Sequence, residues 1–145
     1  MPYSYGVSAR SRAAPDAVFA ALVHPATWPR WSPIDSADVE GGDPGDRQEA
    51  GDTRIFRSGR GVSRERIVEL VDDRRFVYDS VSGPFRSYRG TVELAPEPGG
   101  GTHITWSATF IPKMPLSGGF WQWYLSRFMQ RMADGLAAYA NATDG

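Results

Sequence analysis

The sequence predicts an α+β protein with a helix-grip fold, in which a curved antiparallel sheet of six or seven strands wraps around one long C-terminal helix. Segments of strand-like pattern follow one another between residues 53 and 112, with a turn signal about every ten residues. One long amphipathic segment follows them, and no other predicted element could cover such a sheet. The 145 residues suit a single domain with a substantial core, so we treat residues 1–145 as one unit.

The N-terminal part is expected to form one strand and two short helices. The segment Tyr3–Arg12 alternates loosely, as a half-buried strand does. Pro15 suits the first turn of a helix, and Pro25 ends that helix because the residue before a proline avoids the α conformation. Further prolines leave room only for a short helical turn, which would point Trp28 and Trp31 in the same direction.

The middle of the chain is expected to contain six strands joined by short turns. The predicted strands are Ala37–Glu40, Thr53–Ser58, Val62–Val71, Arg75–Ser82, Arg86–Ala95 and Thr102–Pro112. Most of the turns between them are rich in glycine and proline, which indicates consecutive antiparallel hairpins. The last strand alternates most clearly, and its buried face would carry Ile104, Trp106, Ala108 and Phe110.

The C-terminal segment predicts one helix that follows the break at Pro112–Gly119 and runs to about Thr143. Apolar side chains recur in it at steps of three and four, the spacing of a single buried face: Trp121, Leu125, Phe128, Met132, Leu136 and Tyr139. At roughly 1.5 Å per residue, such a helix spans a whole small domain.

Composition excludes several classes of function. Lys and Arg number 16 against 17 Asp and Glu, a balance that argues against a dedicated nucleic-acid binder. The absence of cysteine excludes disulfides and thiolate chemistry, and two widely separated histidines do not suggest a metal site. No apolar run approaches the length of a membrane span, and the N-terminus has no signal-like apolar core. We therefore expect a cytoplasmic protein without cofactor, metal or stable membrane insertion.

Several motifs carry a family resemblance. They are Ala14-Pro15-Asp16-Ala17-Val18-Phe19, Trp28-Pro29-Arg30-Trp31, Glu65-Arg66-Ile67-Val68-Glu69-Leu70, Arg74-Arg75-Phe76-Val77-Tyr78 and Gly101-Thr102-His103-Ile104-Thr105-Trp106. Together they resemble the SRPBCC (START-like) superfamily, in its polyketide cyclase/dehydrase and lipid transport branch, from Tyr3 to Tyr139. The resemblance implies a deep apolar pocket for a lipid, polyketide, sterol, hormone or similar molecule. Some members of the family catalyse aromatic cyclisation, and many only bind or carry a ligand.

Two arginines on the strand Val62–Val71 are candidate ligand-binding residues. Arg64 and Arg66 share parity with Val68 and Leu70, so a regular strand that buries these two apolar residues would also turn one or both arginines toward the pocket. A guanidinium there would need a carboxylate or a ligand oxygen as its partner. The alternative is that a bulge or the sheet edge turns the arginines to solvent.

The remaining candidate ligand-binding residues are large apolar or aromatic side chains. Tyrosine hydroxyls in a pocket could orient a polar ligand group, and methionine adapts to irregular ligands, although plain core packing is the alternative for each. The candidates are Trp28, Trp31, Tyr78, Tyr88, Trp106, Phe110, Phe128, Met129 and Met132. Trp28 and Trp31 would form either an aromatic lid over the pocket or an anchor for the short helix. Asp79, with parity opposite Tyr78, is expected to face outward.

The aromatic segment Phe120–Tyr124 has more apolar side chains than one helix face can bury. Three uses are open: a gate for a ligand or for membrane-borne cargo, a homodimer contact, or packing under the preceding loop.

Three functional hypotheses follow. The first is a carrier or binding protein that holds a small hydrophobic ligand between the sheet and the long helix. The second is an enzyme of the polyketide cyclase/dehydratase type, in which Arg66 would stabilise an enolate while Tyr78 or Tyr88 donates a proton. The third is a protein-interaction module. The first is favoured because the faces predicted to line the pocket offer no histidine and no clear carboxylate to act as a base.

Overall fold

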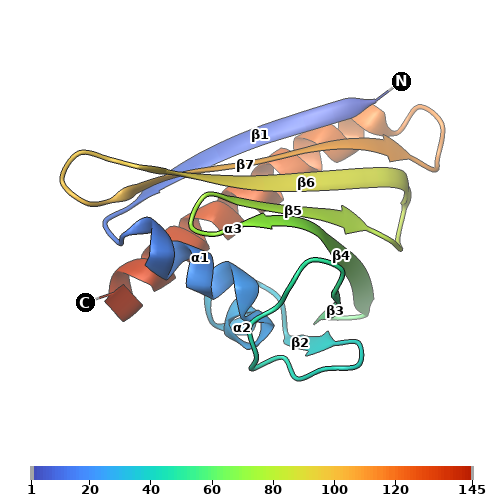
Figure 1. Cartoon of the computed structure of the whole chain (residues 1–145). Coiled ribbons are helices and arrows are strands. Elements are labelled where there is room, and N and C mark those ends of the chain that lie inside the picture. The colour runs from blue at the N-terminus through green and yellow to red at the C-terminus, as the bar shows by residue number, and fades with distance from the viewer. Residues whose placement is uncertain (1, 145) are drawn as a thin grey trace.

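The computed structural model describes residues 2–144, with side chains for residues 2–142, and contains one seven-stranded sheet and one long helix (Figure 1). The elements are β1 Tyr3–Ser11, α1 Pro15–Val23, a 3-10 turn Pro25–Thr27, α2 Trp28–Trp31, β2 Ser36–Val39, β3 Thr53–Ser58, β4 Gly61–Val71, β5 Arg75–Ser80, β6 Phe85–Pro96, β7 Thr102–Pro112 and α3 Gly118–Asp144. This order confirms the predicted helix-grip fold.

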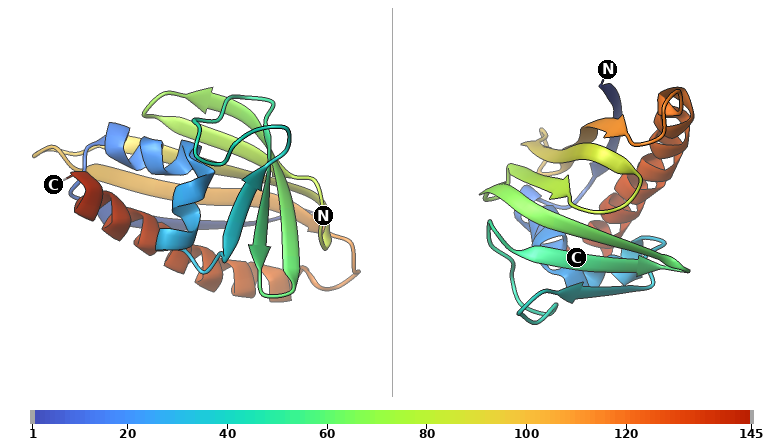
Figure 2. Two further views of the ribbon diagram at one scale, coloured as in Figure 1. Left: turned by 90° about the horizontal axis from the view of Figure 1, so that it is seen from below. Right: turned by 90° about the vertical axis from the view of Figure 1, so that its right-hand side faces the viewer.

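All neighbouring strands are antiparallel, in the order β1-β7-β6-β5-β4-β3-β2. From β2 to β7, strands that are neighbours in the sheet are also consecutive in the sequence. The last strand, β7, pairs with the first strand, β1. The sheet curls strongly, so that β3 and β4 cross α3 steeply while β1 and β7 run beside it (Figure 2). The concave face of this curl holds the core and the cavity described below.

The strand β4 contains a bulge that changes which side chains face the core. Ile67 pairs with Tyr78, but the next pair is Glu69 with Val77, so Val68 is an extra residue in β4. Before the bulge, odd-numbered residues such as Ile67 face inward; after it, the partly buried Leu70 does. Val68 and Leu70 were both expected in the core, and for Val68 this expectation is wrong, because its side chain is exposed.

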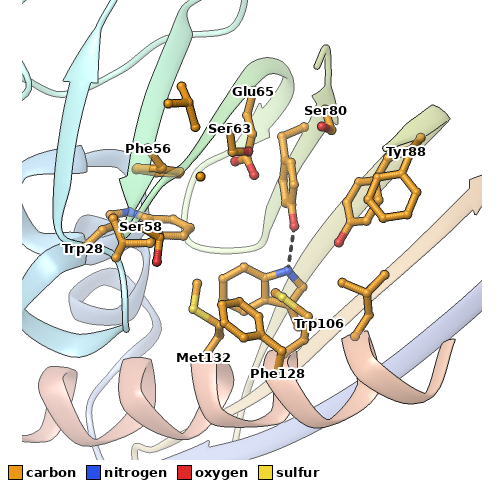
Figure 3. Close-up of a pocket in the computed structure, with 17 residues that line it drawn as sticks. Trp28, Phe56, Ser58, Ser63, Glu65, Ser80, Tyr88, Trp106, Phe128 and Met132 are labelled. Atoms are coloured by element: carbon orange, nitrogen blue, oxygen red, sulfur yellow. Dashed lines mark hydrogen bonds between the residues drawn. The ribbon is translucent and has the colours of Figure 1, made fainter. Parts of the chain in front are cut away.

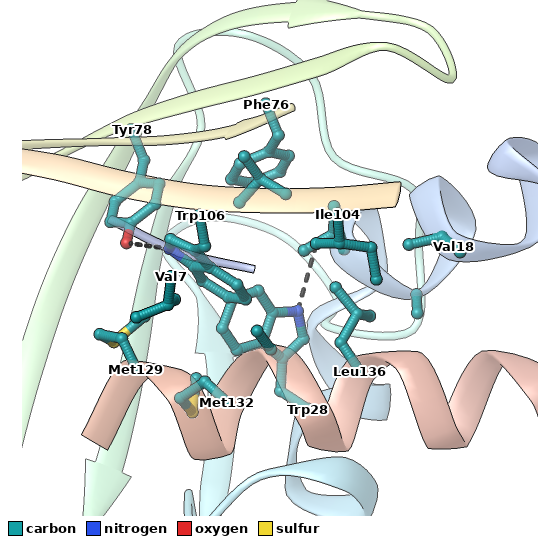
Figure 4. Packing of buried hydrophobic residues seen from close by; sticks show 14 of the residues in the cluster. Val7, Val18, Trp28, Phe76, Tyr78, Ile104, Trp106, Met129, Met132 and Leu136 are labelled. Carbon is teal, nitrogen blue, oxygen red and sulfur yellow. Dashed lines mark hydrogen bonds between the residues drawn. The ribbon is translucent and has the colours of Figure 1, made fainter. Parts of the chain in front are cut away.

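The two short helices lie against the sheet and α3 (Figure 4). Trp28 is buried and its indole nitrogen Nε1 donates to the carbonyl of Leu22 at 3.2 Å, which ties α2 to the end of α1. The Thr27 hydroxyl donates to the carbonyl of Ala21 at 2.8 Å. Side-chain hydrogen bonds therefore help to hold the chain between the two helices. They matter here because the prolines in this segment have no backbone N–H to donate.

The long helix presents the predicted apolar stripe to the sheet. Leu125, Met132 and Leu136 are buried, and Trp121, Phe128 and Tyr139 are partly buried against the core. α3 also passes very close to α2 at Gly135, where a Cβ atom would lie 1.9 Å from the carbonyl oxygen of Trp31. Glycine is therefore required at this position by the helix contact rather than by backbone conformation.

The contact at Gly135 gives a prediction about stability. Gly135→Ala should lower the free energy of unfolding by about 1–3 kcal/mol, because the two helices must move apart to admit a methyl group. This loss should appear even though alanine is the better helix former by about 1 kcal/mol. Gly119→Ala, also in α3 and with open space around it, is the control and should cost nothing. Equal stability of the two variants in urea unfolding would contradict the contact.

Candidate ligand-binding site

A cavity of about 280 Å³ lies between the concave face of the sheet and α3 (Figure 3). Most of its lining is apolar or aromatic, with three serines and one carboxylate among the polar groups. The lining residues are Trp28, Ile34, Phe56, Ser58, Gly61, Val62, Ser63, Glu65, Tyr78, Ser80, Phe85, Tyr88, Trp106, Leu125, Phe128, Met129 and Met132. Such a concave and largely apolar site with few polar groups is typical of small-molecule binding.

Most of the aromatic and methionine candidates do line this cavity. They are Trp28, Tyr78, Tyr88, Trp106, Phe128, Met129 and Met132. Phe110 and Trp31 do not: Phe110 is completely buried behind Tyr88, and Trp31 packs beneath Trp28 with ring centroids 4.5 Å apart. Both tryptophans are buried, so they anchor α2 rather than form a lid.

The expectation that Arg64 and Arg66 face the pocket is wrong. Both lie on the exposed side of β4, and the Arg64 guanidinium forms an ion pair with Glu40 at 2.9 Å. The cause is the bulge at Val68, because the inward face before the bulge has the opposite parity from the face after it. The residue between the two arginines, Glu65, points into the cavity instead. Asp79 faces outward as expected and pairs with Arg89.

Glu65 is held by an arginine that was not among the predicted site residues. Arg54 lies directly opposite Glu65 in the β3–β4 pair, and its Nε and Nη2 donate to Oε1 of Glu65 at 3.1 and 2.9 Å. The Arg54 side chain is 0% exposed and that of Glu65 16% exposed. The two charges thus compensate each other at the wall of the cavity, and breaking the pair would leave one of them buried alone.

Aromatic rings enclose the remaining faces of the Arg54 guanidinium. Its Cζ lies 4.4 to 5.5 Å from the ring centroids of four residues: Trp28, Phe56, Phe76 and Tyr78. Its Nη1 donates to the carbonyl of Leu22 at 3.3 Å. These contacts replace much of the hydration that burial removes. Arg54 therefore supports the cavity wall without lining the cavity.

Burial has opposite effects on the two members of this pair. It lowers the pKa of Arg54, since the charged form loses hydration. It raises the pKa of Glu65 for the same reason, and the attraction of Arg54 offsets only part of that rise. Burial thus favours the uncharged form of each group, and the attraction between the two charges opposes both shifts.

Tyrosine hydroxyls form the second polar group of the site. Trp106 Nε1 donates to the hydroxyl of Tyr78 at 3.0 Å, and the hydroxyls of Tyr5 and Tyr88 hydrogen-bond to each other. The Tyr78 ring lies over Gly90 on the adjacent strand, where a Cβ atom would come within 2.3 Å of the ring. Gly90 therefore creates the space in which Tyr78 lies flat on the sheet.

Burial also keeps these phenols protonated. It raises the pKa of Tyr78 to about 12, with the charge of Glu65 adding to the rise. Burial raises the pKa of Tyr5 and Tyr88 well above the ordinary value, and the neighbouring tyrosines contribute. At neutral pH the three hydroxyls are therefore neutral groups that can donate or accept hydrogen bonds.

The segment Phe120–Tyr124 remains largely at the surface. Phe120, Trp123 and Tyr124 are exposed, which argues against packing under the loop, one of the three uses that the sequence left open. Phe120 stacks on Tyr124, and Tyr124 stacks on Phe128, which lines the cavity. A continuous row of rings along α3 thus leads from the surface to the cavity wall.

Among the residues that the structure describes, no group of three or more His, Asp and Glu side chains could hold a metal ion. Within the same part of the chain, no helix is long and apolar enough to cross a membrane. The cavity lining itself includes Glu65, three serines and the tyrosines Tyr78 and Tyr88.

Comparison with known proteins identifies the family. The family model described as polyketide cyclase/dehydrase and lipid transport matches residues 4–141. Because this match spans nearly the whole sequence, the chain belongs to that family, which confirms the START-like resemblance. A search of curated proteins found none that matches.

Solved structures share the fold at low sequence identity. A START superfamily protein from Mycobacterium smegmatis superposes with a TM-score of 0.79 at 11% identity, covering 97% of this chain and 98% of that one. XoxI from Bacillus cereus gives 0.76 at 18%, with 98% of each chain covered. TTHA0849 from Thermus thermophilus gives 0.72 at 22%, covering 99% of this chain and 100% of the other. These likenesses establish the fold. They do not identify a ligand.

The Arg54–Glu65 pair gives a prediction about stability. Arg54→Met should lower the free energy of unfolding by about 3–5 kcal/mol, because the Glu65 carboxylate would remain in the wall without its partner. The double variant Arg54→Met/Glu65→Leu should recover most of this loss. Arg57→Met, which breaks an exposed ion pair with Asp38, is the control and should cost less than about 1 kcal/mol. A double variant as unstable as the single one in urea unfolding would contradict this role of the pair.

The buried phenols predict a loss of stability in alkali. Between the ordinary tyrosine pKa near 10 and the value of about 12 at Tyr78, the unfolded chain releases protons that the folded chain keeps. The free energy of unfolding should therefore fall as pH rises through this range. Tyr78→Phe should reduce the slope by up to about 1.4 kcal/mol per pH unit. Urea unfolding at several pH values measures both slopes, and identical slopes would count against the effect.

Proposed function

We propose that this protein is a binding or carrier protein that holds a small apolar molecule in the cavity between the sheet and α3. The observation that carries the proposal is the cavity itself, whose lining is mostly aromatic and aliphatic side chains from the sheet, α2 and α3. Family membership supports it, since the family description includes lipid transport. A ligand that enters a largely apolar cavity of this kind removes apolar surface from water, which favours binding.

The size of the cavity narrows the class of ligand. Its volume of about 280 Å³ lies just below the usual range for small-molecule sites, roughly 300–1,000 Å³. This volume favours a molecule of a few fused rings or one short chain over a two-chain lipid. The two methionines in the wall, Met129 and Met132, can adjust to a ligand of irregular outline.

A second candidate function is catalysis of the cyclase/dehydratase type. The observation in its favour is that Glu65 lies in the cavity with a pKa raised by burial, because a carboxylate with a raised pKa is a stronger base. The ion pair with Arg54 opposes this role, since protonation of Glu65 would leave the buried guanidinium uncompensated. We therefore place binding first.

Ligand binding can be tested with the fluorescent dye 1-aminoanthracene, which is neutral and has three fused rings. The wild-type protein should bind it with an increase in fluorescence, and Leu125→Trp should weaken binding at least about tenfold by filling the cavity. Leu116→Trp, the same substitution at an exposed site, is the control and should bind as the wild type does. Equal binding by both variants would overturn the proposal.

Native mass spectrometry of the purified protein complements this test. A co-purifying molecule would be extracted, identified and incubated again with the protein. Recovery of the molecule unchanged is the outcome expected of a carrier, whereas conversion to a cyclised or dehydrated product would establish the second candidate function.

A further inference from the structure

One carboxylate oxygen of Glu65 has no hydrogen-bond partner among the described residues. Oε1 accepts both hydrogen bonds from Arg54, whereas Oε2 accepts none. The side chain is 16% exposed and lines the cavity, so Oε2 is open to whatever occupies that space (Figure 3). Oε2 is not among the fully buried polar atoms that lack a partner, so a ligand that covers it must supply a donor or leave the carboxylate unsatisfied at a cost.

We propose that the cavity selects neutral ligands that carry a hydroxyl group, which donates its hydrogen bond to Oε2 of Glu65, and that it rejects ligands with a carboxylate. This inference rests on the proposed function, because it names the chemical class of ligand for the same cavity.

Ser63 extends this polar site. It lies two residues before Glu65 on β4 and therefore on the same face of the strand, and it also lines the cavity. The other two serines of the lining already donate to backbone carbonyls, Ser58 to Pro33 and Ser80 to Ser82. Within the described residues the Ser63 hydroxyl makes no side-chain hydrogen bond, so it can donate to the oxygen of a ligand hydroxyl whose hydrogen goes to Glu65.

Rejection of anions follows from the charges around the cavity. The lining contains one carboxylate and no lysine, arginine or histidine. The nearest cation, Arg54, is fully buried among ring faces and already bound to Glu65 and to the Leu22 carbonyl. A ligand carboxylate would therefore meet the like charge of Glu65 without a free counter-ion, in a site whose walls are mostly apolar.

Three probes of similar size separate these effects at pH 7: naphthalene, 1-naphthol and 1-naphthoate. Their affinities can be measured by displacement of 1-aminoanthracene. For the wild type, 1-naphthol should bind at least about tenfold more tightly than naphthalene, as expected for a hydrogen bond to a charged acceptor. Ionised 1-naphthoate should bind at least about tenfold more weakly than naphthalene.

Two variants assign the selection to Glu65. Glu65→Gln removes the negative charge and leaves the Arg54 cation. The affinity for 1-naphthoate relative to that for 1-naphthol should therefore rise by tenfold or more. Arg54→Met/Glu65→Leu removes both charges and keeps an apolar wall, which covers the case in which Glu65→Gln does not fold. This double variant should bind naphthalene and 1-naphthol within about threefold of each other. Glu69→Gln, the same substitution at an exposed carboxylate of β4 that does not line the cavity, is the control and should keep the wild-type order.

The outcomes distinguish the two proposals. Equal affinity of the wild type for naphthalene and 1-naphthol, or tight binding of 1-naphthoate, would overturn the selection for neutral hydroxyl ligands and leave the binding function standing. An unchanged order of affinities in both Glu65 variants would also overturn it. Failure of the folded wild type to bind the dye or any of the three probes would instead overturn the proposed binding function itself.

Discussion

A fully buried guanidinium must find nearly all of its interactions within the protein, and that requirement at Arg54 connects much of this structure. Its carboxylate partner comes from β4, its carbonyl partner from the end of α1, and its four aromatic neighbours from α2, β3 and β5. No local segment could supply this set, because the two hydrogen-bonding partners of Arg54 lie 11 and 32 positions away in the sequence. The arginine can be accommodated only when the sheet has curled and the short helices have closed against it.

The same arrangement determines the polarity of the cavity. Because the positive charge lies behind the wall and the negative charge lies in it, a ligand meets a carboxylate rather than a guanidinium. The cavity is therefore apolar with one acceptor site, whereas a pocket lined by Arg64 and Arg66 would have been suited to acids. The phenols of Tyr5, Tyr78 and Tyr88 add hydrogen-bonding capacity without charge, since burial raises the pKa of each and holds it in the neutral form.

The fold was predictable from local signals, and the site was predictable only in part. Turn residues, alternating strands and the stripe on α3 are properties of short segments, and each predicted element appears within a few residues of its expected bounds. Most of the aromatic and methionine residues of the cavity wall were also predicted. Large apolar side chains on the inward faces of the sheet and of α3 line any cavity left between these two elements. The polar residues were missed because one extra residue in β4 reverses the parity, and a bulge has no reliable local signature.

One signal for the buried pair was nevertheless present. The turn at Gly59-Arg60 joins Ser58 to Gly61, and that register places Arg54 opposite Glu65 on the same face as Phe56. Counting outward from this turn, rather than inward from the apolar end of β4, would have found the pair. Register counted from a tight turn is safer than register inferred from hydrophobicity across a long strand.

The bulge at Val68 also bears on how this cavity could change during evolution. Loss of that one residue, with the far half of β4 kept in place, would rotate the near half and exchange Glu65 for its arginine neighbours on the inner face. The charge presented to a ligand would then change sign although no amino acid in the near half of β4 had been replaced. A single insertion or deletion in this strand would thus be enough to reverse the sign of the charge that faces the cavity, without any substitution among the residues that face it.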